Sequence, residues 1–390
     1  MPESSHITIS WTKPTNSHAK LPKEIFINIL KLSIYMRKKI QERAKWEGSP
    51  FPDLYEDILK TPLCEILAKG RHRSELILIH HLHEVALPFI KSMAQGYKIR
   101  KIIGIPYSSV DSVVKELKSF FDVIVPKELE EISGIVEQSV NLSNKSVIIE
   151  EIGGYTTDIA DFLDKSKNVV GVVEDTQQGH WRWQNTSLNR LPVLSVAYSS
   201  TKRIEDHFVA QSIIDGLARY LHQNNLKPLR NQNILVLGFG NIGEQLCRYL
   251  KPICKDLSVY DINPIRLLKA NVDYNISRDF SNIDIVLGVT GKQSVTIDDA
   301  DKLNSNMLLI SGSSKRIEFE QTLPGIINNG EPINLRYSVV PSKVLDLVYG
   351  SLICCINKLD NGFSLQGLHD LDYLEQQKIA EKYKRIYNIR

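Results

Sequence analysis

The chain has 390 residues, of which 42% are apolar and 24% are charged, the composition of an ordinary globular protein. Its 48 Lys and Arg residues nearly balance 45 Asp and Glu residues, and the net charge of +3 argues against nucleic acid or an anionic membrane as the main partner. Five cysteines without CxxC spacing, no secretory signal and no apolar run of about 20 residues predict a cytoplasmic protein with free thiols and no membrane span.

The first half of the chain predicts one α/β domain. After a polar leader at residues 1–20, apolar positions at helical spacing predict a helix over residues 23–46 and another within residues 51–70. Short apolar runs separated by helical stretches follow at residues 76–80, 99–108, 146–154, 168–175 and 191–199. Continuous apolar runs of this length indicate parallel strands covered on both faces, so we expect an α/β domain over residues 21–200.

The second half predicts a separate α/β unit, because the chain is too long for one ordinary hydrophobic core. One long helix over residues 201–225 is expected to connect the two domains. Strands and helices then alternate over residues 226–340. We expect residues 341–390 to form helices that pack back on the first domain, followed by a tail.

A glycine-rich turn is the most informative stretch of the sequence. An apolar strand at residues 234–237 runs into Gly238-x-Gly240-x-x-Gly243, and a helical pattern follows at once. Such glycines permit a tight turn and a close approach of the backbone to a pyrophosphate, whose charge the amides of the helix N-terminus bind. The pattern predicts a Rossmann-type doubly wound parallel sheet that binds a dinucleotide, with Asn241 and Ile242 also in the cofactor site.

The second strand of this unit ends at Asp261, 18 residues after Gly243. An acid near that distance hydrogen-bonds the adenosine ribose and repels a 2′-phosphate, which favours NAD over NADP. Arg266 lies near enough in sequence to raise the question of NADP, although a solvated helix residue is the more ordinary interpretation.

Two further apolar strands, at residues 283–291 and 306–314, end in Gly, Thr and Ser. Ligands in such sheets lie at the carboxyl ends of the strands. Thr290, Gly291 and Gly312 are therefore candidates for the wall around the nicotinamide, and plain turn residues are the alternative.

Several segments in order resemble S-adenosylhomocysteine hydrolase (adenosylhomocysteinase). The segments are IHHLHE (79–84), IIEEIGGYT (148–156), EDTQQGHWRW (174–183), SSTKRIEDH (199–207) and YDINP (260–264). The resemblance covers most of residues 70–340 and makes the first domain a substrate-binding domain. It implies oxidation of a ribose 3′-hydroxyl by NAD, which makes the neighbouring 4′-proton acidic. Elimination or addition at the 5′ position and reduction by the stored hydride follow.

The resemblance also implies roles for individual residues. Lys202 and Asp206, four residues apart on a helix, match the pair that handles the 3′-hydroxyl; an exposed ion pair on a solvated helix is the alternative. His80 matches an acid or base for the 5′ position, with a core or rim histidine as the alternative. Glu151 and Asp175 match a catalytic Asp and Glu with the two side-chain lengths exchanged.

Other matched positions concern binding. Cofactor contacts are implied for Thr176, Gln177, Gln178 and Asn334, and substrate contacts for Glu84, His207 and Ser313. His80, His81 and His83 suit neither a strand face nor a helix face, so we expect no metal site.

The sequence departs from the family at its C-terminal end. Ser313 stands where the family has a histidine that contacts the ribose, and residues 334–342 lack the Gly-His gate over the substrate. The tail with Lys and Tyr that completes a neighbouring protomer's NAD site is also absent; Lys382, Lys384 and Tyr387 are candidates to replace it.

The sequence therefore predicts an NAD-dependent enzyme of this type acting on an adenosine-like nucleoside, forming a homo-oligomer (dimer or tetramer) and binding neither nucleic acid nor membrane. S-adenosylhomocysteine hydrolysis is the leading reaction. The alternatives are the same chemistry on another nucleoside, for example by a dehydratase, a non-catalytic NAD(H)-binding protein, and a hydroxyacid or amino-acid dehydrogenase with a similar two-domain plan.

Overall fold

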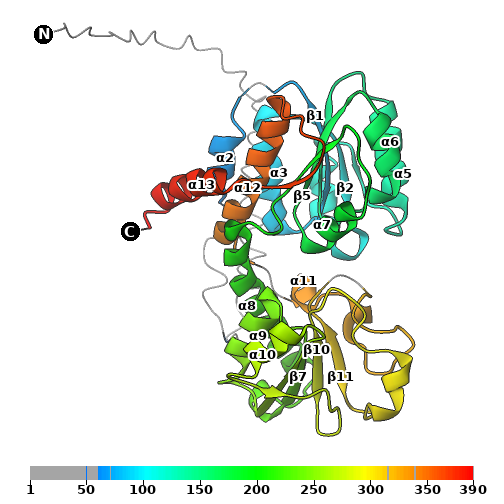
Figure 1. Cartoon of the computed structure of the whole chain (residues 1–390), viewed down its shortest axis with the longest axis vertical. Coiled ribbons are helices and arrows are strands. Elements are labelled where there is room, and N and C mark those ends of the chain that lie inside the picture. The colour runs from blue at the N-terminus through cyan, green and yellow to red at the C-terminus, as the bar shows by residue number, and fades with distance from the viewer. Residues whose placement is uncertain (1–49, 51–59, 71, 314–315, 338–339, 390) are drawn as a thin grey trace, which may run out of the picture. The chain divides into compact units, whose positions relative to one another are not determined.

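The fold is described from a computed structural model, which covers residues 50, 60–70, 72–313, 316–337 and 340–389 (Figure 1). The expected leader at residues 1–20 and the helix over residues 23–46 lie outside the described residues. So do residues 51–59 of the next expected helix, and α2 (Pro62–Leu67) occupies the part that is described. The described residues all belong to one unit, Ala44–Arg390.

The first half of the chain and one strand of the C-terminal segment build a seven-stranded sheet in which every pairing is parallel. Its order is β12-β6-β5-β4-β1-β2-β3. The strands are β1 (Glu75–His80), β2 (Lys98–Gly104), β3 (Val123–Ile124), β4 (Val147–Glu151), β5 (Val169–Glu174), β6 (Pro192–Ser195) and β12 (Gly367–Asp370). All residues of β1 and β4 are buried, because helices cover both faces of the sheet.

Helices α5 and α6 lie on one face of this sheet, and α2, α3 and α12 lie on the other (Figure 1). The helices of this part are α3 (Leu87–Gly96), α4 (Asp111–Leu117), α5 (Glu131–Asn141), α6 (Ala160–Lys165), α7 (Gln177–Gln184), α12 (Ser342–Asp360) and α13 (Tyr373–Ile386). Buried side chains of β1, β4 and β5 pack with those of α5 and α6 in one hydrophobic core.

The long helix α8 (Ser200–Gln223) begins where the Ser199 side chain accepts a hydrogen bond from the backbone N–H of Lys202. A serine in this position satisfies one of the free amides at the helix start. Thr201 and Ser351 of α12 share a hydrogen bond of 3.0 Å, which fixes the start of α8 against α12. The first turns of α8 are therefore held rigidly where they meet the candidate site.

The second sheet has five parallel strands in the order β11-β10-β7-β8-β9. Its strands are β7 (Asn233–Leu237), β8 (Asp256–Tyr260), β9 (Asn275–Ile276), β10 (Ile285–Gly288) and β11 (Leu308–Ser311), and its helices are α9 (Asn241–Leu250), α10 (Pro264–Ala270) and α11 (Ile333–Tyr337). Short 3-10 turns complete the described chain: η2 (Glu84–Ala86), η3 (Pro106–Ser108), η4 (Thr157–Ile159), η5 (Leu229–Asn231), η6 (Ile297–Lys302) and η7 (Ile327–Gly330).

From β7 the chain adds β8 and then β9 on one side of the sheet, and it then returns to add β10 and β11 on the other side of β7. This is the doubly wound order, and its reversal point lies between β7 and β10. The α/β class with two parallel sheets that the sequence predicts is confirmed. In such sheets the crevice at the reversal point, beyond the carboxyl ends of the strands, is where ligands bind.

The C-terminal segment differs from expectation in one element. The sequence predicts only helices and a tail over residues 341–390, yet β12 joins the edge of the first sheet beside β6. None of the helices in the described ranges combines the length and the apolar character that a bilayer crossing requires.

Candidate functional site

A cavity of about 350 Å³ gathers residues from the carboxyl ends of strands in both sheets and from α8 and α12. The sequence-predicted residues that line it are His80, Asp175, Thr176, Gln177, Gln178, Lys202, Asp206, Gly240, Asn241, Ile242, Thr290, Gly291, Gly312, Ser313 and Asn334. The structure therefore brings most of the predicted substrate and cofactor residues to one place.

The glycine turn leaves room for a ligand at one position only. A Cβ on Gly240 would meet nothing closer than the Arg266 guanidinium at 3.7 Å. A Cβ on Gly243 would lie 1.9 Å from the carbonyl oxygen of Gly238, so Gly243 serves the packing of α9 against β7. Gly238 has a φ of +100°, which favours glycine. Gly240 is the N-cap residue of α9 and supplies no side-chain cap, so the amides of the first turn face the cavity that Gly240 lines.

Asp261 ties the glycine turn to β8. Its carboxylate accepts hydrogen bonds from the amides of Phe239 (2.6 Å) and Asn263 (2.8 Å), and it is only 5% exposed. Arg266 lies 3.5 Å from the same carboxylate, and Arg266, not Asp261, lines the cavity. The Asp261 carboxylate, which the sequence predicts to bind ribose, thus already accepts hydrogen bonds from two backbone amides. The Arg266 guanidinium lies beside the glycine turn.

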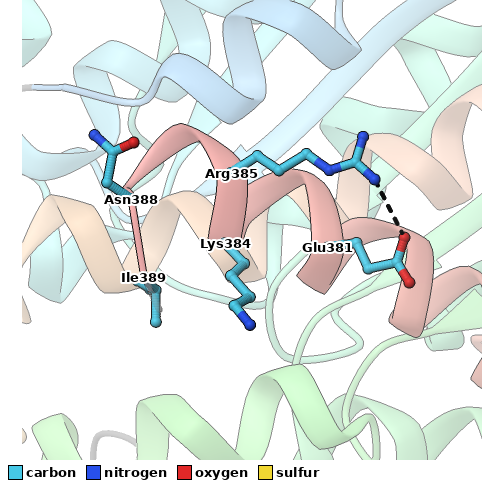
Figure 2. A pocket seen from close by; sticks show the side chains of 5 residues that line it. All are labelled: Glu381, Lys384, Arg385, Asn388 and Ile389. Atoms are coloured by element: carbon cyan, nitrogen blue, oxygen red, sulfur yellow. Dashed lines mark ion pairs between the residues drawn. The ribbon is translucent and has the colours of Figure 1, made fainter.

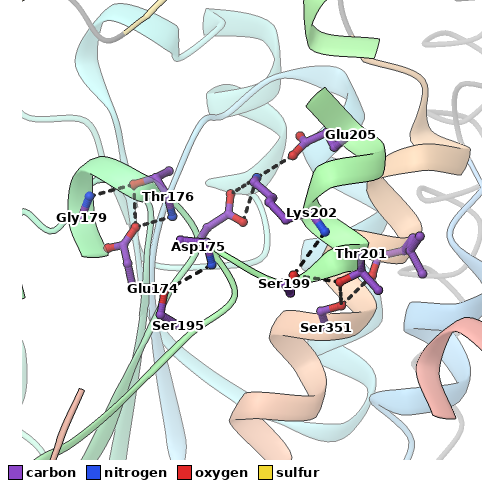
Figure 3. Close-up of polar contacts among 12 residues, drawn as sticks. Glu174, Asp175, Thr176, Gly179, Ser195, Ser199, Thr201, Lys202, Glu205 and Ser351 are labelled. Carbon is purple, nitrogen blue, oxygen red and sulfur yellow. Dashed lines mark hydrogen bonds and ion pairs between the residues drawn. The ribbon is translucent and has the colours of Figure 1, made fainter. Parts of the chain in front are cut away.

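Lys202 is the centre of the polar network in the cavity (Figure 3). Its ammonium lies 3.0 Å from both oxygens of Asp175 and 2.6 Å from Glu205. Burial alone would lower the pKa of Lys202, but the two carboxylates outweigh burial and raise it well above the usual value. The lysine is therefore a fixed ammonium that can donate hydrogen bonds but cannot act as a base.

The partners of Lys202 differ from those that the sequence predicts. The spacing of four residues predicts a pair with Asp206, but the structure pairs Lys202 with Glu205, three residues away, and with Asp175. Asp206 instead shares a hydrogen bond with the side chain of Asn241. Burial, followed by the charge of Glu205, raises the pKa of Asp206 to about 6.

His80 is the last residue of β1, and only one of its two ring nitrogens has a hydrogen-bond partner among the described residues. Its Nδ1 lies 3.1 Å from the carbonyl oxygen of His81, whereas its Nε2 is buried without a hydrogen-bond partner among the described residues. Because a carbonyl only accepts, Nδ1 carries the proton and Nε2 presents a lone pair. Burial lowers the pKa of His80, so the ring is neutral at physiological pH. Packing against Phe89 and Tyr349 fixes its orientation.

Glu151 lies outside the cavity. Its carboxylate accepts hydrogen bonds from Thr156 (backbone 3.0 Å, hydroxyl 2.8 Å) and from the indole of Trp183 (2.7 Å), and it is fully buried. Such a satisfied carboxylate holds the loop after β4 in place. Its neighbour Glu150 points to the other face of the strand, as successive strand residues do.

Glu150 is a buried acid that the sequence analysis did not single out, and it does not line the cavity. Both its carboxylate oxygens are buried without a hydrogen-bond partner among the described residues. Burial raises its pKa well above the usual value, with the charge of Asp175 as the next cause. Alternation along β4 and β1 puts Glu150 on the same face as Leu78 and His80. The sequence signal was present in the Glu-Glu pair, but choosing between the two requires the strand register.

The wall around the expected nicotinamide position is organised by Glu318, which the sequence analysis also missed. Its carboxylate accepts hydrogen bonds from the Gly291 amide (2.7 Å), the Thr290 hydroxyl (2.8 Å) and the Ser313 hydroxyl (2.5 Å). Burial raises the pKa of Glu318. A Cβ on Gly312 would lie 2.8 Å from carbon atoms of Ile213 and Val289, so this glycine is required by packing.

Thr176 is the N-cap residue of helix α7. Its hydroxyl accepts from the Gly179 amide (3.1 Å) and donates to Glu174 (2.7 Å). Burial, and then the charge of Glu151, raise the pKa of Glu174 to about 8. Gln177 and Gln178 follow at the start of α7 and line the cavity, as does Asn334 in α11.

Two predicted substrate residues do not reach the cavity wall. Glu84 is buried in η2, and His207 is half-buried on α8. Two histidines close to Glu84 in the sequence, His81 and His83, do line the cavity. In the described part of the chain, no group of three or more His, Cys, Asp or Glu side chains is arranged to hold a metal ion.

The residues proposed to replace the family's tail lie away from the cavity. The Tyr387 hydroxyl donates to the Asp346 carboxylate (2.9 Å), which also accepts from the amides of Leu63 and Cys64. Lys384 belongs to an open recess on α13, where the nearby Arg385 pairs weakly with Glu381 at 3.9 Å (Figure 2). Lys382 is exposed on the same helix.

Comparison with known proteins gives distant relatives. No protein-family model matches the chain. An uncharacterized protein of Mycobacterium tuberculosis is 24% identical over 289 residues, covering 66% of this chain and 55% of the relative. The adenosylhomocysteinase of Thermoplasma volcanium is 28% identical over 228 residues, covering 55% of each chain. The chain thus spans about half the length of the curated relatives it matches, and the resemblance to adenosylhomocysteinase is supported as a distant similarity.

Solved structures that align with most of this chain include an oxidoreductase and a reductase. Phosphoglycerate oxidoreductase from Vibrio cholerae o395 aligns with 75% of this chain and 100% of its own, at 11% identity and a TM-score of 0.46. The pyruvate reductase of Chlamydomonas reinhardtii aligns with 74% of this chain and 97% of its own, at 14% identity and a TM-score of 0.40. At these identities and TM-scores, nothing about this chain follows from the two alignments.

Proposed function

We propose that this protein is an NAD-dependent enzyme that oxidises the 3′-hydroxyl of an adenosine-type nucleoside and eliminates or adds a group at the 5′ position. S-adenosylhomocysteine hydrolysis is its leading reaction. The observation that carries the proposal is the meeting, in one cavity, of an open glycine turn, the Lys202 ammonium and the free Nε2 of His80. The distant similarity to adenosylhomocysteinase supports it.

The residues present fit a dinucleotide. The cavity wall at Gly240 and the first amides of α9 would hold the pyrophosphate, and Thr290, Gly291 and Thr176 would border the nicotinamide half. When bound, the nicotinamide would accept a hydride from the ribose and later return it. We propose residues 226–340 as the NAD-binding domain and 21–200 as the substrate domain, joined by the helix at 201–225 and completed by 341–390.

Lys202 would bind and polarise the 3′ oxygen. A carbonyl forming at that carbon carries partial negative charge, which a fixed ammonium stabilises. Asp175 and Glu205 hold the ammonium at 3.0 and 2.6 Å, so it reaches the substrate without first reorganising. The Asp206 carboxyl is the candidate proton acceptor for the hydroxyl, because its pKa of about 6 is close to physiological pH.

His80 would serve the carbon acid or the leaving group. Its Nε2 lone pair is buried and has no hydrogen-bond partner in the described part of the chain, and the His80 side chain lines the cavity. A neutral imidazole can take a proton in one step and return it in the next. Exclusion of water by Tyr349, Val348 and Leu345 of α12 would protect the intermediate from side reactions.

The test uses the purified full chain. NAD binding is measured by titration. Adenosine and S-adenosylhomocysteine are then added separately, while the absorbance of reduced nicotinamide and the products of the 5′ cleavage are followed. We expect reduction with both nucleosides and homocysteine release from the second. Lys202→Ala should abolish reduction, while Lys145→Ala, a change at an exposed lysine, should leave it intact. Reduction by the Lys202→Ala protein at the parental rate would remove the role of this lysine.

A non-catalytic NAD(H)-binding protein is the second candidate. The Ser313 hydroxyl, which stands in place of the family's histidine, donates to Glu318 and is thereby engaged within the chain. Binding of NAD without reduction by any adenosine derivative would favour this candidate over the enzyme. A homo-oligomer and a cytoplasmic location remain predictions of the sequence.

A further inference from the structure

The cavity around Lys202 contains more acids than cations. The carboxylates of Asp175, Glu205 and Asp206 line it, and Lys202 is the one ammonium among the described residues beside them. The other lining cation, Arg266, lies beside Gly240 at the glycine turn.

The histidines of the cavity wall do not all carry a charge. Burial lowers the pKa of His80 and, with the charges of neighbouring histidines, that of His81, so these rings contribute no positive charge at neutral pH. His83 also lines the cavity, and its charge adds to the effect on His81. Arg203 is exposed on α8 and is not part of the wall.

The pKa values of Glu205 and Asp206 respond to this crowding of carboxyl groups. Burial, and then the charge of Glu205, raise the pKa of Asp206; burial also raises the pKa of Glu205, to which Asp175 adds. Like charges that the protein does not compensate disfavour one another, and a ligand cation at this wall would relieve that repulsion.

A second, independent observation points to the kind of cation. His80 is 1% exposed, lines the same cavity, and has an Nε2 lone pair with no hydrogen-bond partner in the described chain. An acceptor of this kind is satisfied by an N–H donor, which an ammonium carries and a sulfonium lacks. The rings of Tyr349, Tyr107 and Trp181 also line the cavity, and aromatic faces attract cations.

We propose that the substrate of the enzyme proposed above carries a protonated amine, which binds against His80 and the Glu205 and Asp206 carboxylates. The inference rests on the proposed function for the nucleoside part. It is compatible with the leading reaction, because a homocysteine group also carries an ammonium.

The test compares two ligands that differ in this group alone. The full chain, saturated with NAD, is titrated calorimetrically with 5′-amino-5′-deoxyadenosine and with adenosine at neutral pH. We expect the amine to bind roughly tenfold more tightly, the gain of one charged hydrogen bond. In Glu205→Gln the preference should shrink to about twofold or less, and Asp206→Asn should reduce it as a second variant.

The controls separate the possible failures. Glu381→Gln changes an exposed carboxylate on α13 and should keep the full preference. NAD titration of each variant checks folding. If NAD and adenosine bind but the amine binds no more tightly, the charge proposal is overturned while the proposed function stands. If NAD or both nucleosides fail to bind the parental protein, the proposed function falls and takes this inference with it.

Discussion

Both carboxylate oxygens of Asp175 lie 3.0 Å from the Lys202 ammonium, joining the end of the first sheet to the first turn of α8. Glu205 approaches the same ammonium at 2.6 Å. The three side chains are largely buried, so the attraction between them is screened little by water. The site is therefore held together by charge at the point where catalysis is proposed.

Lys202→Met should destabilise the protein. The change leaves Asp175 and Glu205 buried without their cation, which costs about 3–5 kcal/mol. The double variant Lys202→Met/Glu205→Gln should recover part of that loss, because one uncompensated charge has gone. Urea denaturation of both variants and of the parent measures the free energy of unfolding. Equal stability of the single and double variants would show that Glu205 and Lys202 do not interact.

Two glycines of the same turn should respond in opposite ways. Gly240→Ala places a methyl group in ordinary van der Waals contact with Arg266, at 3.7 Å, and should leave folding intact while weakening NAD binding at least about tenfold by blocking the pyrophosphate. Gly243→Ala puts a Cβ 1.9 Å from the Gly238 carbonyl and should lower the melting temperature. Calorimetric NAD titration and thermal unfolding of each variant distinguish the two effects. Undiminished NAD affinity in folded Gly240→Ala would place the cofactor elsewhere.

His80→Gln should lower kcat at least about 100-fold while leaving NAD affinity near the parental value, because an amide fills similar space without a basic nitrogen. His222→Gln, at an exposed histidine in the last turn of α8, is the matched control. Steady-state kinetics with adenosine derivatives and NAD titration provide the two readouts. A His80→Gln enzyme with parental kcat would assign proton transfer to another group.

The pH dependence of the free energy of unfolding should reveal the raised pKa of Asp206. Its pKa in the folded protein is about 6, above the value of about 4 for an exposed Asp. The folded state thus holds this proton more tightly than the unfolded chain, so the contribution of Asp206 to stability falls as the pH rises from about 4 to about 6 and is constant above.

Asp206→Asn should remove this fall. Relative to the parent, the variant should gain on the order of 2–3 kcal/mol across that pH range. Urea denaturation at several pH values measures the difference, and Asp298→Asn, at an exposed aspartate, should show none. Parallel stability curves for Asp206→Asn and the parent would contradict a raised pKa at this position.

The parts of the fold and site that follow from local sequence pattern were predictable. The glycine turn between β7 and α9 depends on a few adjacent residues, and the structure places Gly240 in the cavity as expected. The partner of Lys202 was not predictable, because spacings of three and four residues both lie on one helix face. Glu150 was missed because the register of β4 against β1 decides which carboxyl shares a face with His80. β12 was missed because its pairing with β6 joins distant parts of the chain.

The hydrogen bond between Tyr387 and Asp346 affects the part of the cavity wall that α12 forms. Asp346 stands one helical turn before Tyr349, which lines the cavity and packs on His80. The same carboxylate receives the amides at the start of α2. We expect loss of the Tyr387 hydrogen bond to loosen the contact of Tyr349 with His80, because Asp346 and Tyr349 lie on adjacent turns of α12.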